Sequence, residues 1–168
     1  MILDFVAIDF ETASYSPHSA CSVGLAEYRN GGKCRTFYSR IRPPQLYVRP
    51  DFTAIHGLTA DDLRDAPSFD ILWPEIRAFI GGLPLLAHNA AFDRSVLQAT
   101  LAWYGIECPP YRFYCSLQAA RRAWPEGRHA LTVLAGRFGI VYDAHNALAD
   151  AETCARIFLL AQQETDAP

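Results

Sequence analysis

The stretch Val6-Ala7-Ile8-Asp9-Phe10-Glu11-Thr12 decides how the rest of the chain is arranged. It belongs to an apolar run over residues 2–10, which is typical of a central strand covered on both faces. Asp9 and Glu11 are two residues apart, so in an extended strand their side chains point to the same face. A divalent cation, a proton or a basic partner would relieve the repulsion between two such acids. For this pair alone, two solvated acids at a strand exit remain the alternative.

The composition is that of a globular protein with one sizeable core. The chain has 168 residues, of which 51% are hydrophobic and 12% aromatic. This predicts a single domain over residues 1–168, with a short polar tail after about residue 163. The net charge of −3 does not suggest a protein that coats duplex DNA. With four acids neutralised by metal, however, the remainder is close to neutral and can meet a phosphate backbone locally.

Cysteine usage and hydropathy predict a cytoplasmic protein without a membrane segment. Five cysteines are present, none in a Cys-x-x-Cys pair, so we expect reduced and mostly buried thiols. Cys115 and Cys154 are expected in the core. The start of the chain lacks the pattern of a signal peptide, and no apolar stretch approaches the length of a membrane span.

Strands and helices alternate in the second half of the chain, which favours the α/β class with a mixed sheet. The stretch Arg29-Asn30-Gly31-Gly32 contains Asn-Gly, a strong hairpin signal, so the first three strands should form an antiparallel meander. Residues 42–58, which contain three prolines, are predicted to be a long irregular connection. The predicted strands are 2–10, 21–28, 34–41, 83–87 and 111–115. The predicted helices are 60–64, 69–80, 88–104, 116–123, 131–138 and 146–163.

Three further residues occur where they can join the first acidic pair. Asp93 opens the helix after a short buried strand, and His145 and Asp150 bracket the start of the last helix. Ligand sites in open α/β sheets gather at the carboxyl ends of strands, so these side chains should meet Asp9 and Glu11. Four carboxylates suit hard cations, here two Mg²⁺ with Mn²⁺ as a substitute. Such ions would activate a water and clamp a phosphodiester, and His145 would act as the general base.

The motifs and their order resemble the DEDDh family of 3′→5′ exonucleases, which includes the proofreading epsilon subunit of bacterial DNA polymerase III. The resemblance covers nearly the whole chain. Its motifs are Asp9-Phe10-Glu11-Thr12, Ile55-His56-Gly57-Leu58-Thr59, His88-Asn89-Ala90-Ala91-Phe92-Asp93, the segment 131–140, and His145-Asn146-Ala147-Leu148-Ala149-Asp150-Ala151. The sister family with a tyrosine base has Tyr-x₃-Asp, and this chain has no tyrosine at that spacing.

The resemblance implies a ribonuclease H-like fold, in which the antiparallel meander of strands one to three is followed by parallel strands four and five, flanked by helices. It also implies metal ligands at Asp9, Glu11, Asp93 and Asp150, with His145 as the base. Family members hold the terminal nucleotide with the first motif and the loop after strand three. The corresponding candidates are Thr12, His56, Gly57, Leu58, Asn89 and Phe92.

Several individual side chains have a functional and a structural interpretation. Leu58 is a candidate wedge against the terminal base. Phe92 would either stack on a base or pack in the core, and packing is favoured. His88 is expected to have a structural role. Arg121, Arg122, Arg128 and Arg137 would either track phosphates or form a solvated helix face, and the second is slightly favoured.

The predicted function is a metal-dependent 3′→5′ exonuclease that hydrolyses phosphodiester bonds at a single-stranded or frayed 3′ end and releases nucleoside 5′-monophosphates. DNA is the favoured substrate, in proofreading or DNA repair. The alternatives are a 3′→5′ exoribonuclease on short or structured RNA, a non-catalytic nucleic-acid or polymerase-binding module, and a hydrolase of small phosphoesters. The sequence leaves open whether the chain forms a homodimer or joins a polymerase.

Overall fold

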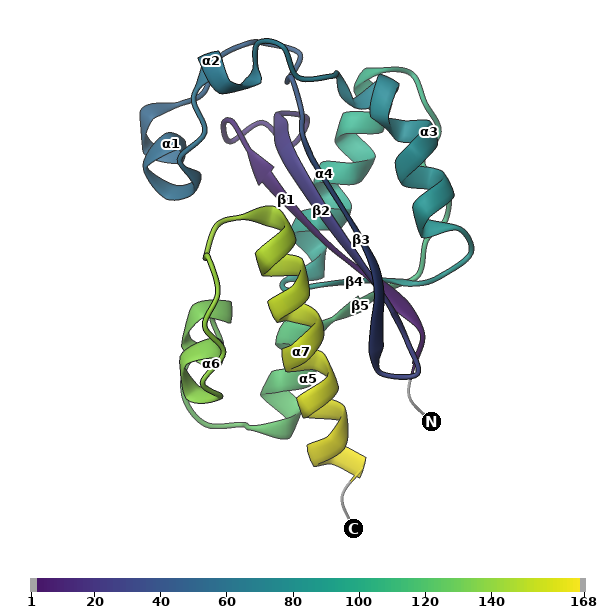
Figure 1. The fold of residues 1–168 in the computed structure, drawn as a ribbon, viewed down its shortest axis with the longest axis vertical. Coiled ribbons are helices and arrows are strands. Elements are labelled where there is room, and N and C mark those ends of the chain that lie inside the picture. Colours follow the sequence, from purple (N-terminus) through teal and green to yellow (C-terminus); the bar gives the residue numbers. More distant parts are fainter. Residues whose placement is uncertain (1–2, 167–168) are drawn as a thin grey trace.

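A central five-stranded sheet with the order β3-β2-β1-β4-β5 organises the computed structural model, which describes residues 3–166 (Figure 1). Strands β1 to β3 form an antiparallel meander, and β4 and β5 run parallel to β1. The predicted α/β class and strand arrangement are therefore confirmed. The strands are β1 (Phe5–Thr12), β2 (Ala20–Arg29), β3 (Gly32–Arg40), β4 (Leu85–Ala87) and β5 (Phe113–Cys115). The helices are α1 (Pro50–His56), α2 (Ala60–Leu63), α3 (Phe69–Ile80), α4 (Ala90–Trp103), α5 (Ser116–Ala123), α6 (Leu131–Arg137) and α7 (Ala147–Asp166).

The central strand β1 reaches further than its apolar run predicts. Glu11 still pairs with Ser22 of β2, and the register shifts only between Glu11 and Thr12. Asp9 and Glu11 are thus held inside the strand by its hydrogen-bond ladder, whereas the sequence places them around its exit. The first residue of the predicted strand, residue 2, lies outside the described range.

The hairpin between β2 and β3 is tighter than expected. Asn30 and Gly31 alone form the turn, both with positive φ (50° and 78°), which matches the two-residue turns that Asn-Gly favours. The strands extend to Arg29 and Gly32 on either side. On its other side β2 pairs with β1 from Tyr28 to Ala20, which places Gly24 opposite Asp9 and Ser22 opposite Glu11.

Helices cover both faces of the sheet, with α3 and α4 on one face and α5, α6 and α7 on the other (Figure 1). Side chains of β1 alternate between the two cores: Val6, Ile8 and Phe10 pack on the first face, and Phe5 and Ala7 on the second. By the same alternation the next two odd positions, the acids of β1, face the side of α7. The prediction that both acids share one face is therefore confirmed.

The segment 42–58 is not wholly irregular, because it contains helix α1. Pro50 stands at the first helical position, and Gly57 closes the helix with a φ of 78°. A proline at the start and a glycine at the end of a helix are strong signals, and the prediction was wrong because the prolines were taken only as breakers. The next helix, α2, begins at Thr59 with the expected cap, and α7 continues to Asp166, beyond the predicted end at residue 163.

The five thiols are free, but they are less buried than predicted. Cys21 and Cys154 are buried and Cys34 is exposed. Cys115, which was expected in the core, is half-buried at the edge strand β5. Within residues 3–166 no helix has the length and apolar character needed to cross a bilayer.

Candidate active site

The structure brings the five predicted catalytic residues to one place at the carboxyl end of β1. Asp9 and Glu11 come from β1, Asp93 from the first turn of α4, and Asp150 from the first turn of α7. Asp93 is buried, and its Oδ1 accepts a hydrogen bond of 3.1 Å from the backbone N–H of Phe10, which ties α4 to β1.

His145 completes the cluster from the other side. Ligand atoms of Glu11, His145 and Asp150 all lie within 4.8 Å of one another. The backbone of His145 has a φ of 65°, and the next residue, Asn146, caps α7 by accepting a 3.2 Å hydrogen bond from the N–H of Ala149. The left-handed residue turns the chain into the helix, so the exposed imidazole stays beside the carboxylates.

A glycine that the sequence analysis did not single out determines how close α7 comes to the sheet. Gly24 of β2 pairs with Asp9. A Cβ atom at Gly24 would lie 2.3 Å from the backbone nitrogen of Leu148 and 2.4 Å from the carbonyl carbon of Ala147. The first turn of α7 therefore rests on bare strand backbone, which carries Asp150 to Asp9. An isolated glycine inside a strand pattern was the available signal.

The crowding of the acids shifts their proton affinity. Burial is the largest cause for Asp9, and the charges of Asp93, Asp150 and Glu11 add to it, so the pKa of Asp9 lies well above its ordinary value. Burial and the charges of Asp150 and Asp93 raise the pKa of Glu11 to about 8. Burial also raises the pKa of Asp93 to about 8, although the N–H of Phe10 opposes the shift. Burial raises the pKa of Asp150, and the neighbouring His145 opposes this shift. The folded chain thus concentrates four acids, and none of them forms a salt bridge with a lysine or arginine within residues 3–166.

One carboxylate oxygen and one phenol at the site, on neighbouring side chains that interact with each other, form no hydrogen bond of ordinary length and angle among the described residues. They are the buried Oδ2 of Asp150 and the hydroxyl of Tyr142. Burial first, and then the Asp150 charge, raises the pKa of Tyr142, so the phenol keeps its proton beside this carboxylate. An orphaned carboxylate oxygen and four crowded acids fit a site for divalent cations, whose preferred ligands are carboxylates. Tyr142 was not anticipated from the sequence, which offered no signal for it.

His56 fastens the α1–α2 loop to the site. Its Nδ1 accepts a 3.1 Å hydrogen bond from the N–H of Leu58, so its Nε2 carries the proton and donates to the carbonyl of Thr12 at 3.0 Å. Desolvation lowers the pKa of His56 and keeps the ring neutral. Both nitrogens are occupied, so His56 positions Thr12 and Leu58 at the end of β1. Leu58 is half-buried and Gly57 is exposed.

Of the candidate residues that follow β4, His88 is held by hydrogen bonds, whereas Asn89 and Phe92 are exposed. The two ring nitrogens of His88 bond Ser116 Oγ (2.8 Å) and the carbonyl of His129 (2.9 Å), as expected for a structural histidine. Phe92 is 44% exposed, so the preference for core packing was wrong: its position on α4 points away from the sheet. Asn89 is exposed and has a φ of 65°.

Comparison with known proteins identifies the class. A family model described as "Exonuclease" matches residues 6–158, so the chain belongs to this exonuclease family, as the motifs predicted. The DNA polymerase III subunit epsilon of Escherichia coli (strain K12) is 29% identical over 92% of this chain and 69% of its own length. The same subunit of Treponema pallidum (strain Nichols) is 31% identical over 92% of this chain and 74% of its own length.

Solved structures support the fold. The nuclease domain of 3′hExo, described as a DEDDh family member bound to rAMP, superposes with a TM-score of 0.82 and 18% identity, over 96% of this chain and 92% of that one. The expected ribonuclease H-like architecture of the DEDDh exonucleases is thereby confirmed.

Proposed function

We propose that the protein is a metal-dependent exonuclease that degrades single-stranded or frayed DNA from the 3′ end and releases nucleoside 5′-monophosphates. One observation carries this proposal: four carboxylates from three separate elements converge beside the exposed His145. Four acids in one buried place destabilise a protein unless cations offset their charge, so a functional role accounts for the cluster better than a structural one.

We propose Asp9, Glu11, Asp93 and Asp150 as the residues that hold two Mg²⁺ ions, with Mn²⁺ as a substitute. When bound, such ions would supply Lewis-acid stabilisation of the phosphate and activation of a water. The all-oxygen donor set and the unpartnered Oδ2 of Asp150 suit hard cations. Zinc is disfavoured because it prefers cysteine and histidine ligands.

The side chains of the protein would divide the remaining work. An imidazole nitrogen of His145 takes the proton of the attacking water and, being exposed, passes it to solvent. The Thr12 end of β1 and Leu58 hold the terminal nucleotide, with His56 fixing both in place. Phe92 is exposed at the start of α4, where it would contact a base.

DNA is the favoured substrate because the curated relatives are subunits of a DNA polymerase. An association with a polymerase belongs to the same proposal. A 3′→5′ exoribonuclease is the alternative, since a protein distinguishes RNA from DNA by its contacts with the 2′-hydroxyl group.

The direction of digestion tests this function. A 5′-labelled single-stranded DNA should shorten gradually into a ladder in the presence of Mg²⁺, and EDTA should stop the reaction. Immediate release of a labelled mononucleotide would mean the opposite polarity. A matched RNA strand, digested in parallel, decides between DNA and RNA as the substrate. A matched duplex tests the preference for single-stranded or frayed ends.

The variant Asp9→Asn separates loss of function from loss of fold. It should be inactive, yet melt at a higher temperature than the wild type in EDTA, because one repelling charge is gone. Mg²⁺ should raise its melting temperature less than that of the wild type. Normal digestion by this variant would refute the proposed site.

A further inference from the structure

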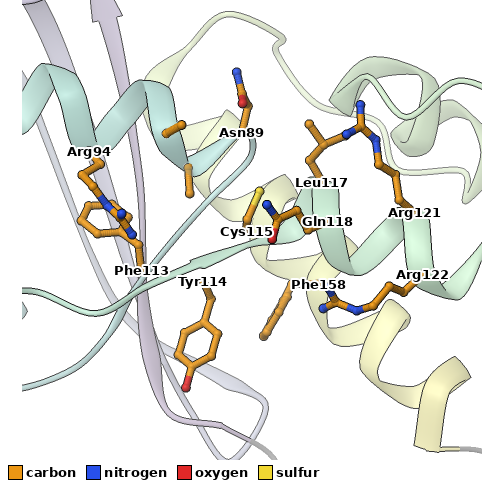
Figure 2. Close-up of a pocket in the computed structure, with 12 residues that line it drawn as sticks. Asn89, Arg94, Phe113, Tyr114, Cys115, Leu117, Gln118, Arg121, Arg122 and Phe158 are labelled. Atoms are coloured by element: carbon orange, nitrogen blue, oxygen red, sulfur yellow. The ribbon is translucent and has the colours of Figure 1, made fainter.

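A cavity of about 310 Å³ lies at the free edge of the sheet, between α4 and α5 and against β5 (Figure 2). Arg94 of α4 stands on one side of it, and Arg121 and Arg122 of α5 stand on the other (Figure 2). Gln118 lies between the two sides. In the described part of the chain β5 pairs with β4 alone, so the cavity opens along an unpaired strand edge.

The charge of this cavity is unbalanced. None of its lining residues is acidic, although the chain as a whole has a net charge of −3. Within the described residues, Arg94, Arg121 and Arg122 form no salt bridge. Most arginines of the hairpin and of the α1–α2 region, in contrast, pair with a nearby acid, as Arg35 does with Glu27. Three guanidinium groups around one cavity predict an anionic ligand.

The three arginines of the cavity are exposed, and one of them is held by a stacking contact. The guanidinium of Arg94 stacks over the ring of Phe113, 5.0 Å from its centre. Arg122 extends toward Phe158 (Figure 2). Neutral hydrogen-bonding groups complete the lining through Asn89 and Gln118. A planar guanidinium group, whether stacked like that of Arg94 or exposed like those of Arg121 and Arg122, can form paired hydrogen bonds to phosphate oxygens.

The cavity is a neighbour of the carboxylate cluster. Only β4 separates β5 from β1, and two strand spacings amount to about 10 Å. Asp93 and Arg94 are consecutive on α4, and helical geometry turns the first toward β1 and the second toward β5. A single strand whose 3′ end lies at the acids can therefore have its upstream phosphates at the arginines.

We propose that this cavity binds the phosphodiester backbone of the substrate strand, a few nucleotides upstream of the bond that is cut. Its link to catalysis rests on the proposed function, whereas its affinity for a strand does not. The sequence slightly favoured a solvated face for the arginines of this region. In the structure Arg121 and Arg122 are exposed, as that expectation requires, and they also line the cavity with Arg94, whereas Arg128 and Arg137 lie outside its lining.

The double variant Arg121→Gln/Arg122→Gln tests the site. Binding of a labelled single-stranded DNA of about 12 nucleotides, a length within known site sizes, is measured by fluorescence anisotropy in EDTA. We expect affinity to fall about tenfold, and the slope of log affinity against log salt to decrease by about 1 to 2. With Mg²⁺, the ratio of oligomer cleavage to dinucleotide cleavage should fall about tenfold.

Arg156→Gln is the matched control, because Arg156 is exposed, lies on α7 close to Tyr28, and forms no salt bridge with the described residues. It should behave as the wild type. Equal binding by the double variant, or an equal loss in the control, would overturn the proposal. So would an equal loss of affinity for thymidine 5′-monophosphate, since this would indicate a mononucleotide site.

The two proposals fail in different ways. A wild-type chain that cuts no strand, while the arginines still govern binding in EDTA, refutes the nuclease and supports the cavity. If the wild type digests DNA from the 3′ end and the Arg121→Gln/Arg122→Gln variant binds and cuts equally well, the nuclease is supported and the phosphate-binding cavity is refuted.

Discussion

The two halves of the acidic site are held by different means. Asp9 and Glu11 belong to the central strand, where hydrogen bonds to β2 and two hydrophobic cores fix every residue. His145 and Asp150 belong to the loop and first turn that begin α7, and their position depends on the contact of this turn with Gly24. The strand half is therefore rigid by secondary structure, and the helix half is positioned by the packing of α7 and by side-chain contacts such as Lys33 with Glu152.

This difference indicates where the site is vulnerable. Replacing a carboxylate in the strand half or in the helix half should abolish activity in both cases. A change to the packing should impair only the helix half, because β1 does not depend on α7 for its ladder. The four predictions below separate these cases.

The largest effect is expected from removing one carboxylate of the helix half. Asp150→Asn should lower kcat/KM on single-stranded DNA by about 1000-fold, which corresponds to about 4 kcal/mol of lost transition-state stabilisation. A steady-state digest with Mg²⁺ measures it. Asp143→Asn, in the exposed part of the same loop, is the control and should stay within twofold. Equal activities of the two variants would contradict a role for Asp150.

The next effect concerns the general base. His145→Asn should lower kcat by roughly 100- to 1000-fold, as is typical of a lost base. Asparagine tolerates the positive φ of this position, so the start of α7 should be preserved. The melting temperature should therefore not change, and a steady-state digest with Mg²⁺ measures the rate. A variant as active as the wild type would assign the proton transfer to another group.

The packing itself is tested by Gly24→Ala. The added Cβ would overlap backbone atoms that cannot move without shifting α7, which should cost about 1–3 kcal/mol of stability. Activity should fall by about 100-fold, because a displacement of about 1 Å can have this effect. Thermal unfolding and cleavage rates are both measured. Gly136→Ala in α6, where a Cβ meets nothing within 4 Å, should be neutral or slightly stabilising.

The smallest effect is on the stability of the metal-free protein. Glu11 and Asp93 have a pKa of about 8 in the folded state, far above their values in the unfolded chain. Between these values the folded state holds protons that the unfolded state has released, so stability decreases as pH rises. In EDTA the melting temperature should fall between about pH 6.5 and 8, by about 2–4 °C for each kcal/mol lost.

Mg²⁺ should restore stability most strongly at the alkaline end, where the carboxylates are free to bind it. A melting temperature in EDTA that rises over this pH range would show that the acids are not crowded as described.

Much of the fold and the identity of the five catalytic candidates followed from local patterns. Alternation in β1 placed Asp9 and Glu11 on one face, and Asn30-Gly31 marked the hairpin. The helix α1 was missed although Pro50 and Gly57 frame it, because a proline both starts helices and breaks them. Phe92 was misjudged because its exposure depends on how α4 sits on the sheet.

Sequence alone was enough to name the candidate groups for the proposed chemistry, since charge, side-chain type and strand period are local properties. Three relations become visible only in the fold: Gly24 leaves room for α7, the buried Oδ2 of Asp150 has no hydrogen bond within residues 3–166, and Arg94 lines one cavity with Arg121 and Arg122. These relations join residues that are far apart in the chain, and no local pattern records them. They arise when hydrophobic burial brings distant helices onto one sheet.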